Sequence, residues 1–425
     1  MSKIRIAQVG CGGMGKRHIM GQIELKKQGF DTFELVALCD NNLSTANHLA
    51  KICQDELNTT PKIYNNFDDL LKFEKPDAID IVTDTKSHHS IAINAFNHGA
   101  HVAVEKPLSI TVKSGILMIE TAKKHNKVLS VSENYRRDPL NRLTKFMIEK
   151  NIFGNPRIAI FTSANGTKYV PHTTAWRHLK LRGGYLLDYE VHTADLLLYF
   201  LGSVKETYAT TILWEPKRIN SKEPNTDKTH LSDFYSHRIQ EDIDKKSMID
   251  CDSEDFACAI FKFKNKATVQ FLSTIASPGL NQKISKISLE KGTISPSPSR
   301  SGKEIQIIND ENIKLTKEQV SKITKDFDLD VTTKKIFNTS NSISSYDIPF
   351  NIIDRKLIAL ELQDFATAIL NNSKPEVTGE IGLEALSLIY SILESGHIER
   401  PVNFDDVYHD RINHYQKPIN DSIGL

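Results

Sequence analysis

The chain has 425 residues, a length at which two domains are the expectation. Hydrophobic residues make up 39% and charged residues 25%, as in an ordinary globular protein. The 54 Lys and Arg residues balance the 53 Asp and Glu residues, so charge gives no case for nucleic acid or an anionic membrane as the main partner. No apolar run approaches the roughly 20 residues that span a bilayer. The five cysteines include no Cys-x-x-Cys pair, which favours a reducing, cytoplasmic compartment and argues against structural zinc.

Six apolar runs alternate with helical segments over residues 1–135, which we expect to form the first domain. These runs are Ile4–Val9, Phe33–Cys39, Lys62–Tyr64, Ala78–Val82, His101–Val104 and Val128–Val131. Continuous apolar runs are typical of strands that are buried on both faces. Short helical crossovers between such strands indicate an α/β fold with a doubly wound parallel sheet.

A glycine-rich turn, Gly10-x-Gly12-x-x-Gly15, lies directly between the first strand and the first helix. Gly10 suits a tight turn, Gly12 lets the backbone approach a pyrophosphate, and Gly15 allows close packing of the helix. The helix N-terminus then faces the anionic phosphates. The position of the turn, more than its glycine spacing, predicts a dinucleotide site.

Asp40 ends the second predicted strand, 25 residues after Gly15. A carboxylate there accepts hydrogen bonds from the ribose hydroxyls and repels a 2′-phosphate. Asn41 and Asn42 follow, with no Arg to hold such a phosphate, so we expect NAD, with NADP as the alternative. The structural alternative for Asp40 is an N-cap of the next helix.

Two further segments follow parallel strands and should share the carboxyl edge of the sheet, where ligands bind. Glu105-Lys106-Pro107 follows the fifth strand, and Lys106 would face the reactive ring of a bound dinucleotide. Thr83 follows the fourth strand, with His88 five residues on. Lys106 could instead be a solvated loop residue, and His88 could cap the next helix or line the cleft.

Residues 136–425 should form a second domain built on a large, mostly antiparallel open sheet. Its expected strands are Arg157–Ser163, Thr207–Trp214, Phe256–Phe263, Ala267–Ser273 and Ile284–Leu289. Two amphipathic helices, Asp354–Leu370 and Ile381–Ser395, should cover the sheet or pack back on the first domain. Residues of about 215–250 and 310–348 are polar insertions, and Ser295–Ser301 is a predicted flexible stretch.

A helix after Gly183-Gly184 carries the densest set of candidate residues. Asp188 and His192 are four residues apart and share one helix face, with Asp195 one turn further. A carboxylate beside an imidazole can make a general acid or base. The same group could ligate a metal, although no further ligand cluster appears, or His192 could be a buried histidine paired for structural reasons alone.

The chain resembles the Gfo/Idh/MocA oxidoreductases, the family of glucose–fructose oxidoreductase and inositol dehydrogenase. The segments that carry the resemblance are Gly10–Gly15, Asp40, Thr83 with His88, Glu105-Lys106-Pro107, Asn134–Pro139, Trp176-Arg177, and Gly183-Gly184 with Asp188 and His192. The resemblance implies a Rossmann domain, an α/β domain with an open sheet, and NAD(P)-dependent chemistry on a sugar, cyclitol or polyol carbon.

The resemblance also assigns expected roles to individual residues. Lys106, Asp188 and His192 correspond to the catalytic trio: His192 accepts the hydroxyl proton, Asp188 orients His192 and binds a neighbouring hydroxyl, and Lys106 polarises the carbinol oxygen. The residues expected at the cofactor are Gly10, Gly12, Gly13, Met14, Gly15, Asp40, Thr83, His88, Glu105, Lys106, Trp176 and Arg177. Tyr135 and Arg136 are expected on the substrate side of the cleft.

Three positions depart from the family pattern: Asp84 stands where proline is usual, Arg182 where a third glycine is usual, and Glu190 where glycine is common. We expect Asp84 and Glu190 to add negative charge in or near the cleft. These departures affect the substrate more than the chemistry.

Three functions remain open from the sequence. The leading hypothesis is an NAD-dependent dehydrogenase acting on a sugar-like secondary hydroxyl. The second is a tightly held NAD that is recycled in sugar–sugar oxidoreduction or glycoside cleavage, and the third is a dinucleotide-binding sensor without catalysis. The uncovered face of an open sheet further predicts a homodimer or homotetramer.

Overall fold

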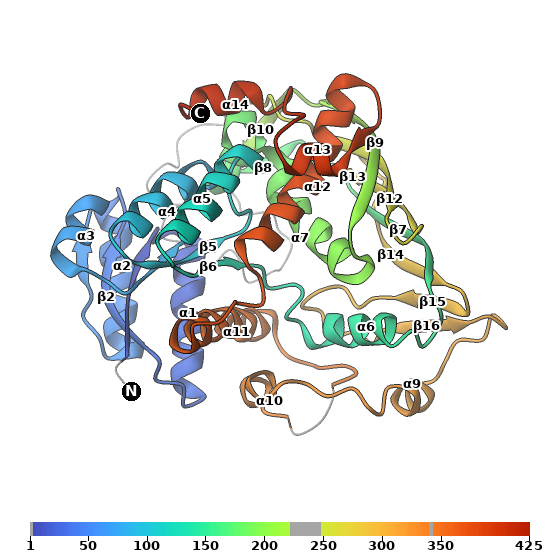
Figure 1. Cartoon of the computed structure of the whole chain (residues 1–425), viewed down its shortest axis with the longest axis horizontal. Coiled ribbons are helices and arrows are strands. Elements are labelled where there is room, and N and C mark those ends of the chain that lie inside the picture. Colours follow the sequence, from blue (N-terminus) through green and yellow to red (C-terminus); the bar gives the residue numbers. More distant parts are fainter. Residues whose placement is uncertain (1–2, 222–247, 340–342) are drawn as a thin grey trace.

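The computed structural model describes residues 3–221, 248–339 and 343–425, which form two sheets with helices packed around them (Figure 1). The first sheet lies at the blue, N-terminal side, and the second lies at the opposite side. Among the described residues, no helix is both long and apolar enough to cross a membrane.

The first sheet has six parallel strands in the order β3-β2-β1-β4-β5-β6, and the predicted doubly wound fold is confirmed. Its strands are β1 (Ile4–Val9), β2 (Phe33–Cys39), β3 (Lys62–Tyr64), β4 (Ala78–Ile81), β5 (His101–Glu105) and β6 (Leu129–Ser132). Its helices are α1 (Gly13–Lys27), α2 (Leu43–Ile52), α3 (Phe67–Glu74), α4 (His88–Asn97) and α5 (Val112–Lys124). All four residues of β4 are buried, as expected of a central parallel strand.

The second sheet has eight strands in the order β16-β15-β14-β7-β13-β12-β9-β17, and every neighbouring pair except β7 and β13 is antiparallel. Its strands are β7 (Pro156–Ala164), β9 (Val204–Ile212), β12 (Phe256–Phe263), β13 (Thr268–Thr274), β14 (Gln282–Leu289), β15 (Gly292–Ser295), β16 (Gln306–Asn309) and β17 (Val402–Asn403). A small third sheet joins β8 (Tyr169–Pro171), β10 (Lys217–Ser221) and β11 (Met248–Asp250). The predicted large, mostly antiparallel sheet is therefore confirmed.

The helices of the second half are α6 (Pro139–Glu149), α7 (Gly184–Leu201), α9 (Lys317–Ile323), α10 (Val331–Phe337), α11 (Phe350–Asn371), α12 (Gly379–Ile398), α13 (Phe404–Tyr408) and α14 (Lys417–Ser422). Helix α12 packs on β9, α7 and α5, while α11 lies along α1. Phe365 of α11 is buried in the same apolar cluster as Ile6 and Ile19, so the C-terminal part of the chain completes the core of the first sheet.

Two segments that were expected to be irregular, 310–348 and Ser295–Ser301, pack against the rest of the protein. The 310–348 segment contains α9 and α10, and Ile336 of α10 is buried against Leu357 of α11. The predicted flexible stretch Ser295–Ser301 packs against the chain: Ser297 is buried, and the Arg300 backbone N–H donates to Asp138. The centre of the other predicted insertion, 222–247, lies outside the described residues.

Candidate active site

The glycine turn joins β1 to α1 so tightly that it leaves no room for side chains at Gly10 and Gly15. Gly10 has a φ of +99°, and a Cβ at Gly15 would lie 2.3 Å from the Gly10 carbonyl oxygen. Gly12 caps α1 without a side chain, so the amides of the first turn, which includes Gly13 and Met14, are not covered by a capping group. This backbone fits the phosphates of a dinucleotide at a helix N-terminus.

Asp40 lies at the end of β2 beside the glycine turn. Its Oδ2 accepts from the Cys11 amide at 2.7 Å, and its Oδ1 accepts from the Asn42 amide at 2.8 Å. Asn42, not Asp40, caps α2 with its side chain. Because the Asp40 carboxylate is only half-buried, it keeps capacity to accept hydrogen bonds from ribose hydroxyls.

His88 lies behind the carboxyl edge of the sheet rather than on its surface. Its ring is 1% exposed, with Nδ1 3.0 Å from the Pro107 carbonyl oxygen and Nε2 3.3 Å from that of Thr83. Burial lowers the pKa of His88, which keeps the ring neutral. A neutral imidazole carries one N–H and donates to one of these two carbonyl groups, and the expected contact of His88 with the cofactor stays a prediction.

Glu105 also points inward. Its Oε1 lies 3.1 Å from Nε2 of His18, and Nδ1 of His18 lies 2.9 Å from Oδ2 of Asp80. Burial opposes a charge on His18, but the two carboxylates outweigh it and raise the pKa of His18 well above its ordinary value. The Glu105 carboxylate is thus used inside the first domain, and its neighbour Lys106 is what reaches the cleft.

Lys106 joins the edge of the first sheet to α7. Its Nζ donates to the Asp188 carbonyl oxygen at 2.8 Å and lies 3.5 Å from Oδ1 of the same residue. Nε of Arg177 lies 2.9 Å from Oδ2 of Asp188. Burial opposes ionisation of Asp188, but Arg177 and Lys106 outweigh it and lower the pKa of this carboxyl. The Asp188 carboxylate is therefore charged, and only 14% and 9% of the Lys106 and Asp188 side-chain surfaces are exposed.

His192 contacts a residue that the sequence did not single out. Its Nδ1 lies 2.7 Å from Oε2 of Glu133, just after β6, and its ring stacks on Tyr135 with 4.0 Å between ring centroids. The expectation that Asp188 orients His192 is corrected, because Asp188 is engaged by Lys106 and Arg177. Glu133 directly follows β6, just as Thr83 and Lys106 follow their strands. Its place at the carboxyl edge of the parallel sheet was the sequence signal that could have identified Glu133 as a site residue.

The charges around His192 favour its neutral form. Burial and the positive charges of Lys106 and Arg300 hold the pKa of His192 well below its ordinary value. Burial raises the pKa of Glu133 to about 7. A neutral ring that donates from Nδ1 to the Glu133 carboxylate leaves a lone pair on Nε2, which is the arrangement of a general base.

Tyr135 and Arg136 have different surroundings, although both were expected on the substrate side. The Tyr135 hydroxyl accepts from Arg300 at 2.9 Å, and its ring faces His192. Arg136 is buried and binds both oxygens of Asp195 through Nε and NH2. Arg136 therefore holds α7 through its ion pair with Asp195.

The three departures from the family pattern do not act alike. NH1 of Arg182 and Oδ2 of Asp84 lie 3.0 Å apart, so the two unusual charges neutralise each other. Glu190 is buried on the opposite side of α7 and accepts from the Ser273 hydroxyl at 2.6 Å. The expectation that Glu190 adds charge to the cleft is therefore wrong. Over the described residues, no group of three or more His, Cys, Asp or Glu is arranged to hold a metal.

Both halves of the chain match models of known protein families. Residues 4–133 match the oxidoreductase family with an NAD-binding Rossmann fold, and residues 142–295 match the Gfo/Idh/MocA C-terminal domain.

Two curated relatives are similar over part of the chain. A glycosyl hydrolase family 109 protein of Akkermansia muciniphila is 30% identical over 36% of this chain and 33% of its own length. Levoglucosan dehydrogenase of Pseudarthrobacter phenanthrenivorans is 29% identical over 51% of this chain and 56% of its own length. The chain thus spans between a third and a little over half of these relatives.

A solved structure of a levoglucosan dehydrogenase in complex with NADH shares the fold. Its TM-score is 0.72 at 20% identity, with 95% of this chain and 99% of that chain covered. Both domain matches and the shared fold lead to one conclusion: the chain belongs to the Gfo/Idh/MocA oxidoreductase family.

Proposed function

We propose that the protein is an NAD-dependent dehydrogenase that acts on a secondary hydroxyl, or the corresponding ketone, of a sugar, cyclitol or related polyol. The observation that supports the proposal is the ion pair between Lys106, at the carboxyl edge of the first sheet, and Asp188 of α7, with His192 one turn further on α7 and within the electrostatic influence of both. NAD, when bound, supplies the hydride acceptor at its nicotinamide ring. The glycine turn and Asp40 would hold its phosphates and adenosine ribose.

In this proposal the proton and the developing charge are handled by different residues. His192 removes the hydroxyl proton at Nε2, because its Nδ1 is held by Glu133. Lys106 stabilises the alkoxide that develops on the same oxygen, an effect worth several kcal/mol in a preorganised site. Asp188 fixes the Lys106 ammonium and can accept a hydrogen bond from a neighbouring substrate hydroxyl.

A panel of sugars and polyols, assayed with NAD and NADP side by side, tests this proposal. We expect NADH formation with at least one cyclic polyol or sugar and a preference for NAD. Turnover that needs NADP alone would contradict the role given to Asp40. Absence of turnover across the panel despite tight NADH binding would favour the sensor.

A second candidate is glycoside cleavage with a retained NAD. It is supported by the relative named as a glycosyl hydrolase family 109 protein. Nicotinamide absorbance in the purified protein, together with release of aglycone without net NADH formation, would favour it. An enzyme that is purified empty and that consumes NAD stoichiometrically would exclude it.

We further propose a homodimer or homotetramer through the outer face of the eight-stranded sheet. Tyr208 and Ile260 are paired neighbours on this face, and 49% and 38% of their surfaces are exposed. Light scattering of wild type and Ile260→Lys tests the proposal: a multimer that the substitution dissociates supports it, and a wild-type monomer contradicts it. We place the domain boundary between residues 135 and 136. Since all five cysteines are free thiols, we also propose a reducing, cytoplasmic location.

A further inference from the structure

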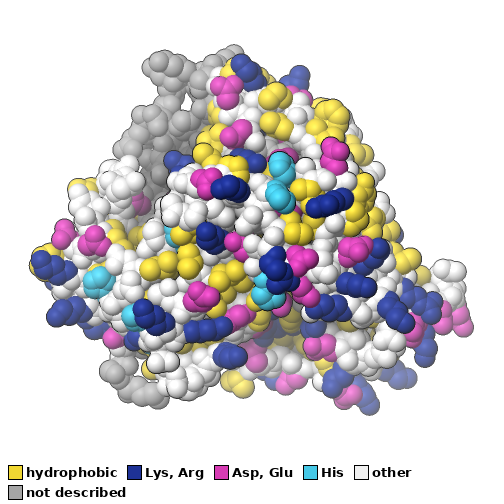
Figure 2. All heavy atoms as spheres, turned by 45° about the horizontal axis from the view of Figure 1, so that its top comes forward, with side chains coloured by type: hydrophobic (Ala, Val, Ile, Leu, Met, Phe, Trp, Pro, Cys, Tyr) yellow, Lys and Arg dark blue, Asp and Glu magenta, His cyan; other side chains and the backbone are white. Residues whose placement is uncertain are grey.

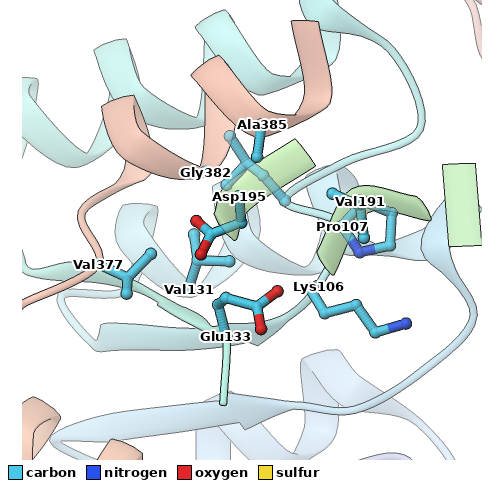
Figure 3. A pocket seen from close by; sticks show the side chains of 10 residues that line it. Lys106, Pro107, Val131, Glu133, Val191, Asp195, Val377, Gly382 and Ala385 are labelled. Carbon is cyan, nitrogen blue, oxygen red and sulfur yellow. The ribbon is translucent and has the colours of Figure 1, made fainter. Parts of the chain in front are cut away.

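A small cavity lies directly behind the His192–Glu133 pair. Glu133 and Asp195 both border it, Lys106 borders it on the side of the cleft, and Val131, Val191 and Val377 supply apolar walls. Figure 3 shows the Glu133 and Asp195 side chains at this cavity, with Lys106 beside Glu133. Its size suits about one water molecule, and its two carboxylates supply the polar partners that a buried water needs.

Asp195 reaches this cavity from the same helix as His192. The two residues are three apart on α7, and Asp195 is held by Arg136 on its other side. Asp195 and Glu133 are 2% exposed each, so each carboxylate senses the other through a poorly screened interior. Burial raises the pKa of Asp195 to about 6, and Arg136 opposes that rise.

We propose that Glu133 takes over the substrate proton from His192 and shares it, through a water in this cavity, with Asp195. The inference rests on the proposed dehydrogenase function and adds the route by which the proton leaves the base. Its structural basis is the hydrogen bond between Nδ1 of His192 and Glu133, together with the cavity that Glu133 shares with Asp195.

The substrate O–H bond breaks as its proton bonds to Nε2 of His192, and the C–H electron pair leaves as hydride to the nicotinamide. The Nδ1–H bond of His192 then breaks as its proton bonds to a Glu133 oxygen, which restores a neutral imidazole. From the Glu133 carboxyl the proton passes to the cavity water as that water releases another proton toward Asp195.

Charged groups around His192 and Glu133 affect the pKa values of both side chains. Positive charge reaches the His192–Glu133 pair from Lys106 just after β5, Arg136 in the segment after β6 and Arg300 in the segment after β15. Glu105, Asp188, Asp195 and Glu361 bring carboxyl groups. The surroundings therefore contain charge of both signs, and the Glu133 carboxyl is the group placed between His192 and the cavity.

Infrared difference spectroscopy during pH titration tests the proposal without substrate or cofactor. In wild type we expect the C=O band of a protonated carboxyl with a midpoint of about 7. Glu133→Gln should abolish the component that titrates near 7 and leave that of Asp195 near 6, whereas Glu133→Asp should retain both. Asp195→Asn should lower the midpoint by about one unit, because Arg136 is left without its counter-charge.

Glu190→Gln is the matched control, because Glu190 is a buried acid on α7 that binds Ser273 on the opposite side. It should leave this band and its midpoint unchanged. A component with a midpoint near 7 that survives Glu133→Gln, or an Asp195→Asn titration identical to wild type, would overturn the proposal. Because the experiment needs no turnover, its failure is distinguishable from a failure of the dehydrogenase assignment.

A second readout separates a relay from a structural role. Oxidation of the best substrate from the panel should show a kcat/KM limb that rises with pH near 7 in wild type. In Glu133→Gln the base is His192 alone, so the limb should move to lower pH while the plateau falls. A lower rate with an unmoved limb would show that Glu133 only positions the ring.

Discussion

Arg182 and Asp84 form an ion pair of 3.0 Å that joins the segment before α7 to the loop after β4. The two residues stand at positions where the family usually has glycine and proline, so two departures that look unrelated along the sequence complement each other in space. The Ser87 hydroxyl also donates to the Asp84 carboxylate. We infer that this pair holds together two segments that flank the mouth of the cleft.

Breaking the Asp84–Arg182 pair should speed release of the cofactor. Exposed ion pairs contribute up to about 1 kcal/mol, so Asp84→Ala and Arg182→Ala should each raise the NADH release rate about two- to fivefold. Stopped-flow nicotinamide fluorescence measures this rate. The double variant should be no faster than the faster single variant, and Lys262→Ala, which breaks an exposed pair with Glu206 far along the second sheet, is the control. Additive effects of the two substitutions would contradict a direct coupling.

Asp40→Ala should weaken NADH binding by about ten- to a hundredfold. The substitution removes a charged acceptor for the ribose hydroxyls, and such hydrogen bonds contribute about 1.5–3 kcal/mol. It also frees the Cys11 amide, which Asp40 holds at 2.7 Å. Fluorescence titration with NADH and NADPH measures both affinities, and the ratio between them should fall. An unchanged ratio would remove the argument for NAD over NADP.

Arg300→Ala should move the acid limb of the kcat/KM profile to higher pH in a Glu133→Gln background, where His192 alone is the base. Arg300 lowers the pKa of His192, so its removal raises that pKa and the neutral base appears only at higher pH. The plateau should also fall, because the Tyr135 hydroxyl loses its partner at 2.9 Å. Arg300→Lys keeps the charge and should leave the limb near its position in Glu133→Gln alone. A limb that moves to lower pH on the Arg300→Ala substitution would contradict the electrostatic account.

Asp80→Asn should lower the free energy of unfolding by about 3 kcal/mol, because it removes one partner of a buried ion pair. The folded-state pKa of His18 is raised, so its contribution is fully present below the unfolded pKa and is lost as pH rises through the folded pKa. Urea unfolding at pH 6 and pH 9 should therefore show a larger loss at pH 6. Asp55→Asn, on the surface of the same domain, is the control and should change stability by less than about 0.5 kcal/mol. Equal losses at both pH values would contradict the link to His18.

Local features of the chain predicted the fold well. Ile4–Val9 and Phe33–Cys39 are mostly apolar runs bounded by turn residues, and both strands begin and end as predicted. Spacing along one helix also predicted that Asp188, His192 and Asp195 share a face. All three do lie on α7, and each is held by a residue from outside it.

The partners of those residues could not be predicted, because they come from distant parts of the chain. Glu133 is 59 residues from His192, and Arg300 is 165 residues from Tyr135. Neither Glu133 nor Arg300 belongs to a recognisable spacing pattern with its partner. His88 lies near the carboxyl edge, as predicted, and its buried ring faces the backbone carbonyl groups of Thr83 and Pro107.

In the proposed mechanism Lys106 and His192 carry out the chemistry, while the glycine turn and Asp40 hold the phosphates and adenosine ribose of the cofactor. Rapid-mixing measurement of NADH formation by wild type, Lys106→Ala and His192→Ala, with NADH affinity titrated separately, tests this division of roles. We predict that each substitution lowers the rate of NADH formation by about 100-fold or more, with NADH affinity nearly unchanged. Wild-type rates in both variants on a confirmed substrate would contradict the assignment.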